Sequence, residues 1–359
     1  MKTEVWTLGI GLPKIGVAQA VAAENAGFDG FAVVDSQCLA GDPYVALALA
    51  AQATERIKLA TGVTNPVTRH PAVTASAIGT VQAESDGRAV LGIGRGDSAL
   101  AHLGLSPAPV AVFERYLIHL QSYLRGDAIE FGAARAHTAG AADLAALGLA
   151  AGPQNSRIHW LPGQHRKVPV DVAATGPKVI AAAARYAESV TFAVGADLDR
   201  LRWAIATARE ARQAAGLDPD AIGMGAYLNV VAHDDPSAAL RLAAGTLASF
   251  ARFSVMHGRV QGPADDVERS VLHRVHDVYD MRQHTRAATP QAEQLTEAFA
   301  KRFAILGPST YCIDRLRAVL RLGISKLVII GPGPGTDETE ALAVWARFAG
   351  EVLPALRGD

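Results

Sequence analysis

Short apolar runs alternate with longer amphipathic or alanine-rich stretches along most of this sequence. Apolar runs bounded by glycine, proline and small polar residues are typical of buried strands, and the stretches between them have helical length. The runs predict eight strands, at residues 5–10, 30–34, 57–63, 88–93, 168–173, 189–194, 222–231 and 326–330. This order predicts an α/β protein, a (β/α)8 TIM barrel in which helices surround a closed parallel sheet.

A doubly wound open sheet is the alternative that the same alternation allows. We disfavour it because the first strand runs into Gly9-Ile10-Gly11-Leu12-Pro13 and not into a G-x-G-x-x-G loop. The alternation breaks twice, and we interpret residues 125–167 and 236–302 as insertions after strands four and seven. The first is expected to carry a short hairpin or loop and the second to be largely helical. The prediction is a single barrel domain over residues 1–359.

Composition limits the classes of function. Half of the 359 residues are hydrophobic and the formal net charge is −1, so the chain has no long-range attraction for nucleic acid or an anionic membrane. No apolar stretch is long enough to span a bilayer. Cys38 and Cys312 could pair, but their separation favours two reduced thiols. We expect a cytoplasmic protein without a nucleic-acid or membrane partner.

In a barrel, the carboxyl ends of the strands meet at one face, where active sites lie. The residues at these ends are mostly glycine and small polar side chains: Gly11, Asp35, Ser36, Thr64, Asn65, Gly94, Arg95, Gly96, Asp97, Thr175, Gly176, Pro177, Gly195, Asn229 and 331–335. The sequence shows no G-x-S-x-G nucleophile motif and no cluster with metal-ligand spacing, so we expect no metal. Such a face suits a cofactor that brings its own reactivity.

Two of these loops have a structural and a functional interpretation. Gly94-Arg95-Gly96-Asp97 could border a cofactor, or its glycines could supply positive φ and its aspartate could cap a helix. Thr175-Gly176-Pro177 could bind phosphate through free helix N–H groups, or it could be an ordinary helix start. Spacing alone leaves both pairs open.

The histidines give weaker signals. His70 precedes Pro71 at a predicted helix start and could line the pocket. His273 and His276 share a helix face, but no third ligand is in register, which favours a solvated or interface face over a metal site. The other histidines of the second insertion, His257 and His284, carry no motif.

The stretch GVTNPVTRHPAVTASAIGTVQAESDGRAVLGIGRGD, residues 62–97, resembles the signature of methylenetetrahydromethanopterin reductase, a deazaflavin-dependent branch of the bacterial luciferase-like superfamily. The similarity continues through AATGPKVIAAAARYAESVTFAVGA and returns in LGPSTYCIDRLRAVLRLGISKLVIIGPGPG. It fades in both insertions. The resemblance implies a TIM barrel, coenzyme F420 at the carboxyl-terminal face and a homodimer.

The resemblance also assigns positions around the cofactor. It implies a cis peptide bond between Gly62 and Val63, in a bulge that supports the middle ring. Thr64 and Asn65 would face the ring edge. The remaining expected cofactor contacts come from other strand ends: Asp35, Gly94, Arg95, Gly96, Asp97, Thr175, Gly176, Pro177 and Gly195.

Two departures from the family pattern concern proton transfer. The reductases carry a glutamate in the first strand, whereas this chain has Leu8-Gly9-Ile10-Gly11. Related alcohol and sugar-phosphate dehydrogenases place a histidine after the aspartate that ends strand two, whereas here Ser36 follows Asp35. The pterin substrate is therefore not implied.

We expect an F420-dependent oxidoreductase that transfers hydride from the reduced deazaflavin to an activated C=C or C=N bond of a small molecule or modified peptide. Asp97 is the candidate for a proton or hydrogen-bond role, with Ser36 and His70 as substrate contacts. Asp97→Ala should then lower turnover far more than folding stability. The alternatives are an FMN-dependent monooxygenase of the same superfamily and a cofactor-binding paralogue without catalysis.

Overall fold

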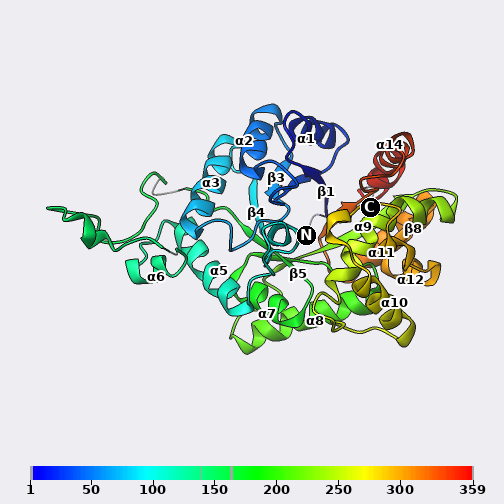
Figure 1. The fold of residues 1–359 in the computed structure, drawn as a ribbon. Helices are drawn as coiled ribbons and strands as arrows, with labels where there is room; N and C mark the ends of the chain where they lie inside the picture. Colours follow the sequence, from blue (N-terminus) through cyan, green and yellow to red (C-terminus); the bar gives the residue numbers. More distant parts are fainter. Residues whose placement is uncertain (1–2, 139, 162–164, 358–359) are drawn as a thin grey trace.

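The computed structural model describes residues 3–138, 140–161 and 165–357, and a closed ring of eight parallel strands forms its centre (Figure 1). The ring consists of β1 (Glu4–Ile10), β2 (Gly30–Val34), β3 (Lys58–Thr61), β4 (Ala89–Ile93), β5 (Val170–Ala174), β6 (Ser189–Phe192), β7 (Gly223–Ala232) and β9 (Lys326–Ile330). The β1–β9, β6–β7 and β7–β9 pairings close it. The predicted TIM barrel is confirmed, and the doubly wound alternative is wrong because the sheet has closed.

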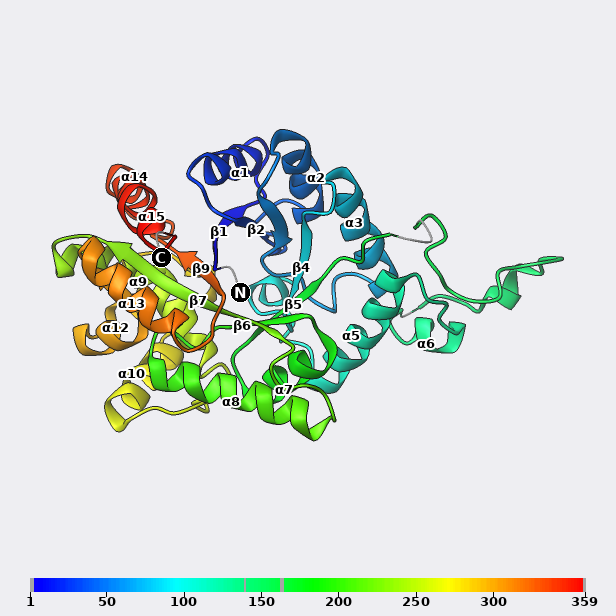
Figure 2. The same cartoon turned by 180° about the vertical axis from the view of Figure 1, so that it is seen from behind.

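Helices surround the ring on its outer face (Figure 2). They are α1 (Ile15–Asn25), α2 (Pro43–Ala53), α3 (Pro71–Glu84), α5 (Val110–Arg125), α7 (Pro177–Tyr186), α8 (Leu198–Ala214), α9 (Pro236–Phe253), α13 (Ser309–Leu320) and α14 (Glu338–Arg347), followed by η3 (Phe348–Val352) and α15 (Leu353–Ala355). The predicted start of α2 is confirmed, since the Asp42 side chain accepts hydrogen bonds from the Tyr44 and Val45 amides. This cap fixes where α2 begins after the β2 loop.

Two strands depart from the predicted pattern. An additional short strand, β8 (Ile305–Gly307), pairs with the last residues of β7 and lies outside the ring. The third strand stops at Thr61, earlier than expected, and the Gly62–Val63 peptide bond that follows it is cis. This cis bond confirms the implication of the family resemblance. Beyond the cis bond, Thr64 bridges to Ile93 of β4 and is fully buried.

The two insertions differ in how they pack. Residues 125–167, of which 139 and 162–164 lie outside the described part, hold α6 (Phe131–Arg135), the 3-10 turn η1 (Leu144–Leu147) and one antiparallel bridge between Ile129 and Ser156. Figures 1 and 2 show this segment reaching away from the barrel beside α3 and α5. Residues 236–302 are largely helical, as predicted, with α9, α10 (Asp266–Asp277), η2 (Met281–Gln283), α11 (Pro290–Glu293) and α12 (Glu297–Phe303). The second insertion has its own apolar cluster.

Polar groups close the amino-terminal end of the barrel. Asp171 of β5 pairs with Lys326 of β9 and accepts a hydrogen bond of 2.8 Å from Thr191. The Lys326 ammonium lies 4.8 Å from the centre of the Trp6 ring. These contacts stabilise the end opposite the candidate site. No helix among the described residues is long and apolar enough to cross a membrane.

The two cysteines are not paired. Cys38 is exposed and Cys312 is buried. The disulfide alternative is therefore wrong.

Candidate active site

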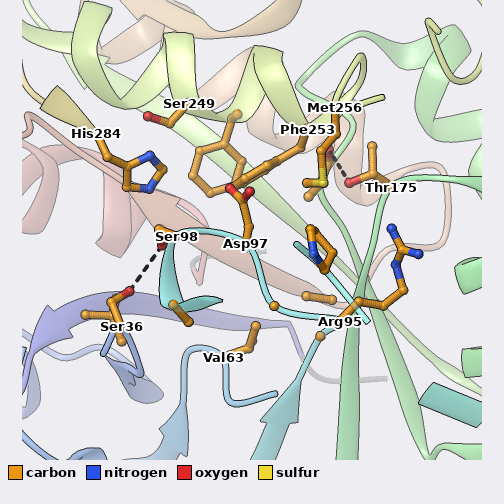
Figure 3. Close-up of a pocket in the computed structure, with 18 of the residues that line it drawn as sticks. Ser36, Val63, Arg95, Asp97, Ser98, Thr175, Ser249, Phe253, Met256 and His284 are labelled. Carbon is orange, nitrogen blue, oxygen red and sulfur yellow. Dashed lines mark hydrogen bonds between the residues drawn. The ribbon is translucent and has the colours of Figure 1, made fainter. Parts of the chain in front are cut away.

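A cavity of about 860 Å³ opens at the carboxyl-terminal face of the barrel. Such a volume is in the range of small-molecule and cofactor sites. Its floor comes from the ends of the strands, and its roof comes from α9 and the segment that follows α10. Phe250, Phe253 and Met256 give the roof an apolar surface. Figure 3 shows Asp97 near the middle, Ser36, Ser98 and His284 at one end, and Arg95 and Thr175 at the other.

Most of the predicted site residues line this cavity. They are Asp35, Ser36, Gly62, Val63, Gly94, Arg95, Gly96, Asp97, Thr175, Gly176 and Pro177. The barrel brings these loops together because parallel strands end at the same face. Four predicted residues, Thr64, Asn65, Gly195 and His70, are not among the lining residues.

Thr64 and Asn65 hold the floor from below. The Thr64 hydroxyl donates to Asp35 Oδ2 at 2.7 Å, and Asn65 Oδ1 accepts from the Val67 and Thr68 amides. Both residues are fully buried, so their expected contact with a ring edge is not what the structure shows. Arg69 pairs with the same Asp35 oxygen at 2.9 Å. This network fixes the loop after β2 against the bulge after β3.

His70 and Gly195 also have structural positions. His70 Nδ1 accepts from the Ala72 amide at 3.1 Å, and Nε2 lies 2.9 Å from the Ala134 carbonyl. Both ring nitrogens are thus used by the protein, and a contact between His70 and substrate is not supported. Gly195 has φ +83°, and a Cβ there would meet the Phe303 ring at 2.6 Å. It permits close packing of α12 against the barrel.

The Gly94–Asp97 loop bears out one part of its structural interpretation and not the other. Gly96 has φ +86°, so the glycine requirement is real. The expected capping by Asp97 is wrong: α4 (Ser98–Ala101) begins without a side-chain cap bond. Asp97 instead forms an ion pair with Arg252 of α9, and both side chains are mostly buried.

Arg252 belongs to a polar network that the sequence did not predict. Its guanidinium lies 4.6 Å from the centre of the Tyr279 ring. The Tyr279 hydroxyl lies 2.7 Å from His284 Nδ1 and 2.9 Å from Ser249 Oγ. Burial lowers the pKa of His284 to about 4 and raises the pKa of Tyr279. At neutral pH both groups are therefore uncharged.

The opposite end of the cavity gathers three cations beside the start of α7, and Arg286 lines the cavity near His284. Arg95, Lys178 and Arg259 line it, and none of the three pairs with a carboxylate in the described part of the chain. Arg95 contacts His257 at 3.2 Å. Burial lowers the pKa of Arg95, but arginine remains charged at neutral pH. Helix α7 begins here at Pro177, and no side chain caps its free N–H groups.

The chemistry of these residues fits a flat cofactor with an anionic tail. A Cβ at Gly94 would lie 3.2 Å from Val63 Cγ2. The lack of a side chain at Gly94 therefore leaves space above the cavity floor beside the bulge. Unpaired cations and an uncapped helix N-terminus are suited to bind phosphate. Within the described ranges, no three His, Cys, Asp or Glu side chains are arranged to hold a metal ion.

A family model and two relatives of known activity match most of this chain. The family model described as luciferase-like monooxygenase matches residues 12–326. The chain is 27% identical over 332 residues to the 5,10-methylenetetrahydromethanopterin reductase of Methanolobus tindarius, with 89% of this chain and 91% of that protein covered. It is also 27% identical to the F420-dependent glucose-6-phosphate dehydrogenase of Intrasporangium calvum, with 96% of each covered.

A solved structure is similar over its whole length. The coenzyme F420-dependent tetrahydromethanopterin reductase of Methanopyrus kandleri superposes with a TM-score of 0.72 at 22% identity, covering 99% of this chain and 100% of that one. At this identity the likeness supports the barrel fold and not a shared substrate.

Proposed function

This chain belongs to the luciferase-like monooxygenase family, and from that premise we propose that it uses coenzyme F420 to reduce an activated C=C or C=N bond. The chain is an oxidoreductase of this family, because its relatives are F420-dependent reductases and dehydrogenases. The observation that carries the proposal is the cavity with a glycine-containing floor, where Arg95, Lys178 and Arg259 gather beside the uncapped start of α7. The acceptor is a small molecule or a modified peptide.

The residues present fit the cofactor. Val63 and Gly94 would support the ring, and Arg95, Lys178 and the start of α7 would hold its phosphate. When bound, the reduced deazaflavin supplies a hydride. The apolar residues Phe250 and Phe253 would exclude water and align the acceptor over the ring.

Binding of F420 is the first test, because it separates this proposal from the alternatives. The purified protein is titrated with F420 and with FMN, and quenching of protein fluorescence is measured. We expect F420 to bind and Lys178→Glu to weaken it by about tenfold or more, since a repulsive charge replaces an attractive one. The control is Arg321→Glu, because Arg321 is exposed and does not line the cavity.

Two outcomes favour other functions. Tight FMN binding without F420 affinity would indicate a monooxygenase, as the description of the family model allows. Binding of F420 without reduction of any acceptor in a screen of activated alkenes and imines would indicate a cofactor-binding paralogue.

The homodimer also stays a prediction. Size-exclusion chromatography with light scattering on the purified protein tests it.

A further inference from the structure

Reduction of a double bond needs a proton as well as a hydride, so the proposed function raises the question of where the proton comes from. The first strand has no acid at Leu8–Gly11, and Ser36 replaces a histidine after strand two. The two carboxylates that line the cavity, Asp35 and Asp97, are each paired with an arginine. A carboxylate held by a guanidinium is a poor proton donor.

The other candidate donors at the cavity are Lys178, two histidines and a tyrosine. Lys178 lies in the first turn of α7 at the cationic end, where the proposed function assigns it to the cofactor phosphate. His257 is exposed and lies beside Arg95 at the cationic end. Tyr227 is buried in the barrel, and burial together with the Asp171 carboxylate raises its pKa, whereas Tyr279 faces the Arg252 guanidinium. His284 remains, at the end of the cavity that also holds Ser36 and Ser98 (Figure 3).

The surroundings of His284 determine which of its nitrogens carries the proton. Tyr279 has one hydroxyl proton and two neighbours, His284 Nδ1 at 2.7 Å and Ser249 Oγ at 2.9 Å. An imidazole nitrogen is a far stronger base than a serine hydroxyl, so the Tyr279 proton goes to Nδ1. The neutral ring then carries its own proton on Nε2. Among the described residues Nε2 has no hydrogen-bond partner, and the ring lines the cavity.

The charges behind the pair stabilise the state that follows proton loss. The Arg252 guanidinium faces the Tyr279 ring at 4.6 Å, and Asp97 holds that guanidinium in place. Ser249 Oγ lies within hydrogen-bond distance of the phenol oxygen. A phenolate formed at Tyr279 would thus meet one cation and one hydroxyl. His102 and Asp97 are the other ionisable groups close enough to act on His284.

We propose that His284, backed by Tyr279, donates the proton that completes reduction of the acceptor. Once one carbon of the double bond has received hydride, the electron pair of the former π bond remains on the neighbouring atom. That pair forms a bond with the Nε2 proton, while Nδ1 takes the phenolic proton of Tyr279. The imidazole stays neutral throughout, and the negative charge moves to the Tyr279 oxygen beside Arg252. A solvent proton then enters at Nε2 through the cavity while Nδ1 returns its proton to the Tyr279 oxygen, so both groups regain their starting state. The acceptor gains two electrons and two hydrogens, and the cofactor loses two electrons.

The tautomer of His284 tests this proposal without any acceptor. Protein labelled with ¹⁵N-histidine is measured by NMR near neutral pH, and His284→Gln assigns the signals. We expect a protonated Nε2 and an unprotonated Nδ1 that accepts a hydrogen bond, and we expect Tyr279→Phe to remove the effect of that bond on Nδ1. A proton on Nδ1 would leave a lone pair on Nε2, and the donor role would be overturned.

Turnover gives the second test, with F420 and methyl 2-acetamidoacrylate as the probe alkene. His284→Gln and Tyr279→Phe should keep F420 affinity within about threefold. They should slow reduction of the probe by about 100-fold or more, the contribution of a positioned acid. The matched control is His276→Gln, since His276 lies on α10 outside the cavity.

The outcomes separate this inference from the proposed function on which it rests. Full turnover in His284→Gln would overturn the inference and leave the F420-dependent reductase intact. Absence of F420 binding in the unaltered protein would overturn the proposed function, whereas the NMR result would still decide the tautomer. Loss of F420 affinity in both variants would show that the pair acts in binding and would also overturn the donor role.

Discussion

Replacing Asp97 by asparagine removes the charge that pairs with Arg252 and should cost about 2–4 kcal/mol of folding free energy. The estimate follows from burial: the Asp97 and Arg252 side chains are 16% and 10% exposed. Loss of one partner from a fully buried pair costs about 3–5 kcal/mol, and loss from an exposed pair costs about 1 kcal/mol or less. Arg252 Nε already lacks a partner among the described side chains, so the arginine has few alternatives.

A double-mutant cycle measures the coupling directly. Asp97→Asn, Arg252→Gln and the double variant are unfolded in urea without cofactor, and circular dichroism and fluorescence are compared to check for two-state behaviour. We expect the double variant to lose at least about 1.5 kcal/mol less than the sum of the single losses, since it leaves no unpaired charge. The control is Glu340→Gln, which breaks the exposed Arg241–Glu340 pair and should cost less than about 1 kcal/mol.

This ion pair changes an expectation drawn from the sequence. Asp97→Ala was expected to lower turnover far more than stability, but the structure predicts a substantial loss of both. Additive single losses, within about 0.5 kcal/mol, would refute the reasoning. Asp97 and Arg252 would then not stabilise each other, and the proton role expected for Asp97 from the sequence would again be the better explanation of this residue.

Two further predictions concern pH and cofactor binding. Burial, together with the neighbouring His119, lowers the pKa of His137 from 6.5 to about 4. The unfolded chain therefore binds the proton first, and stability should fall as the pH drops from about 6.5 to 4, by about 1–2 kcal/mol after a discount for the partial exposure of this ring. His137→Gln should remove that part of the loss in urea titrations at each pH, and an unchanged pH profile would contradict the assignment. Gly94→Ala should weaken F420 binding by about tenfold, because its Cβ would occupy space on the cavity floor beside Val63. The 3.2 Å contact of that Cβ with Val63 Cγ2 should cost about 1 kcal/mol of folding free energy, which urea unfolding measures separately. Unaltered F420 affinity in this variant would place the ring elsewhere.

The barrel could be predicted because its signals are local and repeated. Each buried strand is a short apolar run, and each helix start such as Asp42-Pro43 carries its own cap. The additional strand β8 could not be predicted, since its three residues form a strand only through pairing with β7. The early end of β3 at Thr61 likewise does not follow from apolar periodicity.

The site was predictable only where it consists of strand ends. Barrel closure brings Val63, Gly94 and Thr175 to one face whatever their separation in sequence. Arg252 and Asp97 are 155 residues apart, and their contact depends on how the second insertion packs over that face. The burial of Thr64 and Asn65 was not apparent from the sequence for a related reason, because the chain continues past β3 as a buried bridge to β4.

The cavity therefore has two sides with different origins. The floor and the cationic end come from loops that the fold itself positions, and these parts match the requirements of the proposed cofactor. The roof and the His284–Tyr279 pair come from residues 236–302, where the family resemblance fades. A proton donor on this insertion can differ between relatives without altering the floor that holds the ring. In this chain no acid stands at Leu8–Gly11, where β1 ends, and the insertion supplies the His284 imidazole at the cavity, so the proposed proton source can differ while the residues that would hold the cofactor stay in place.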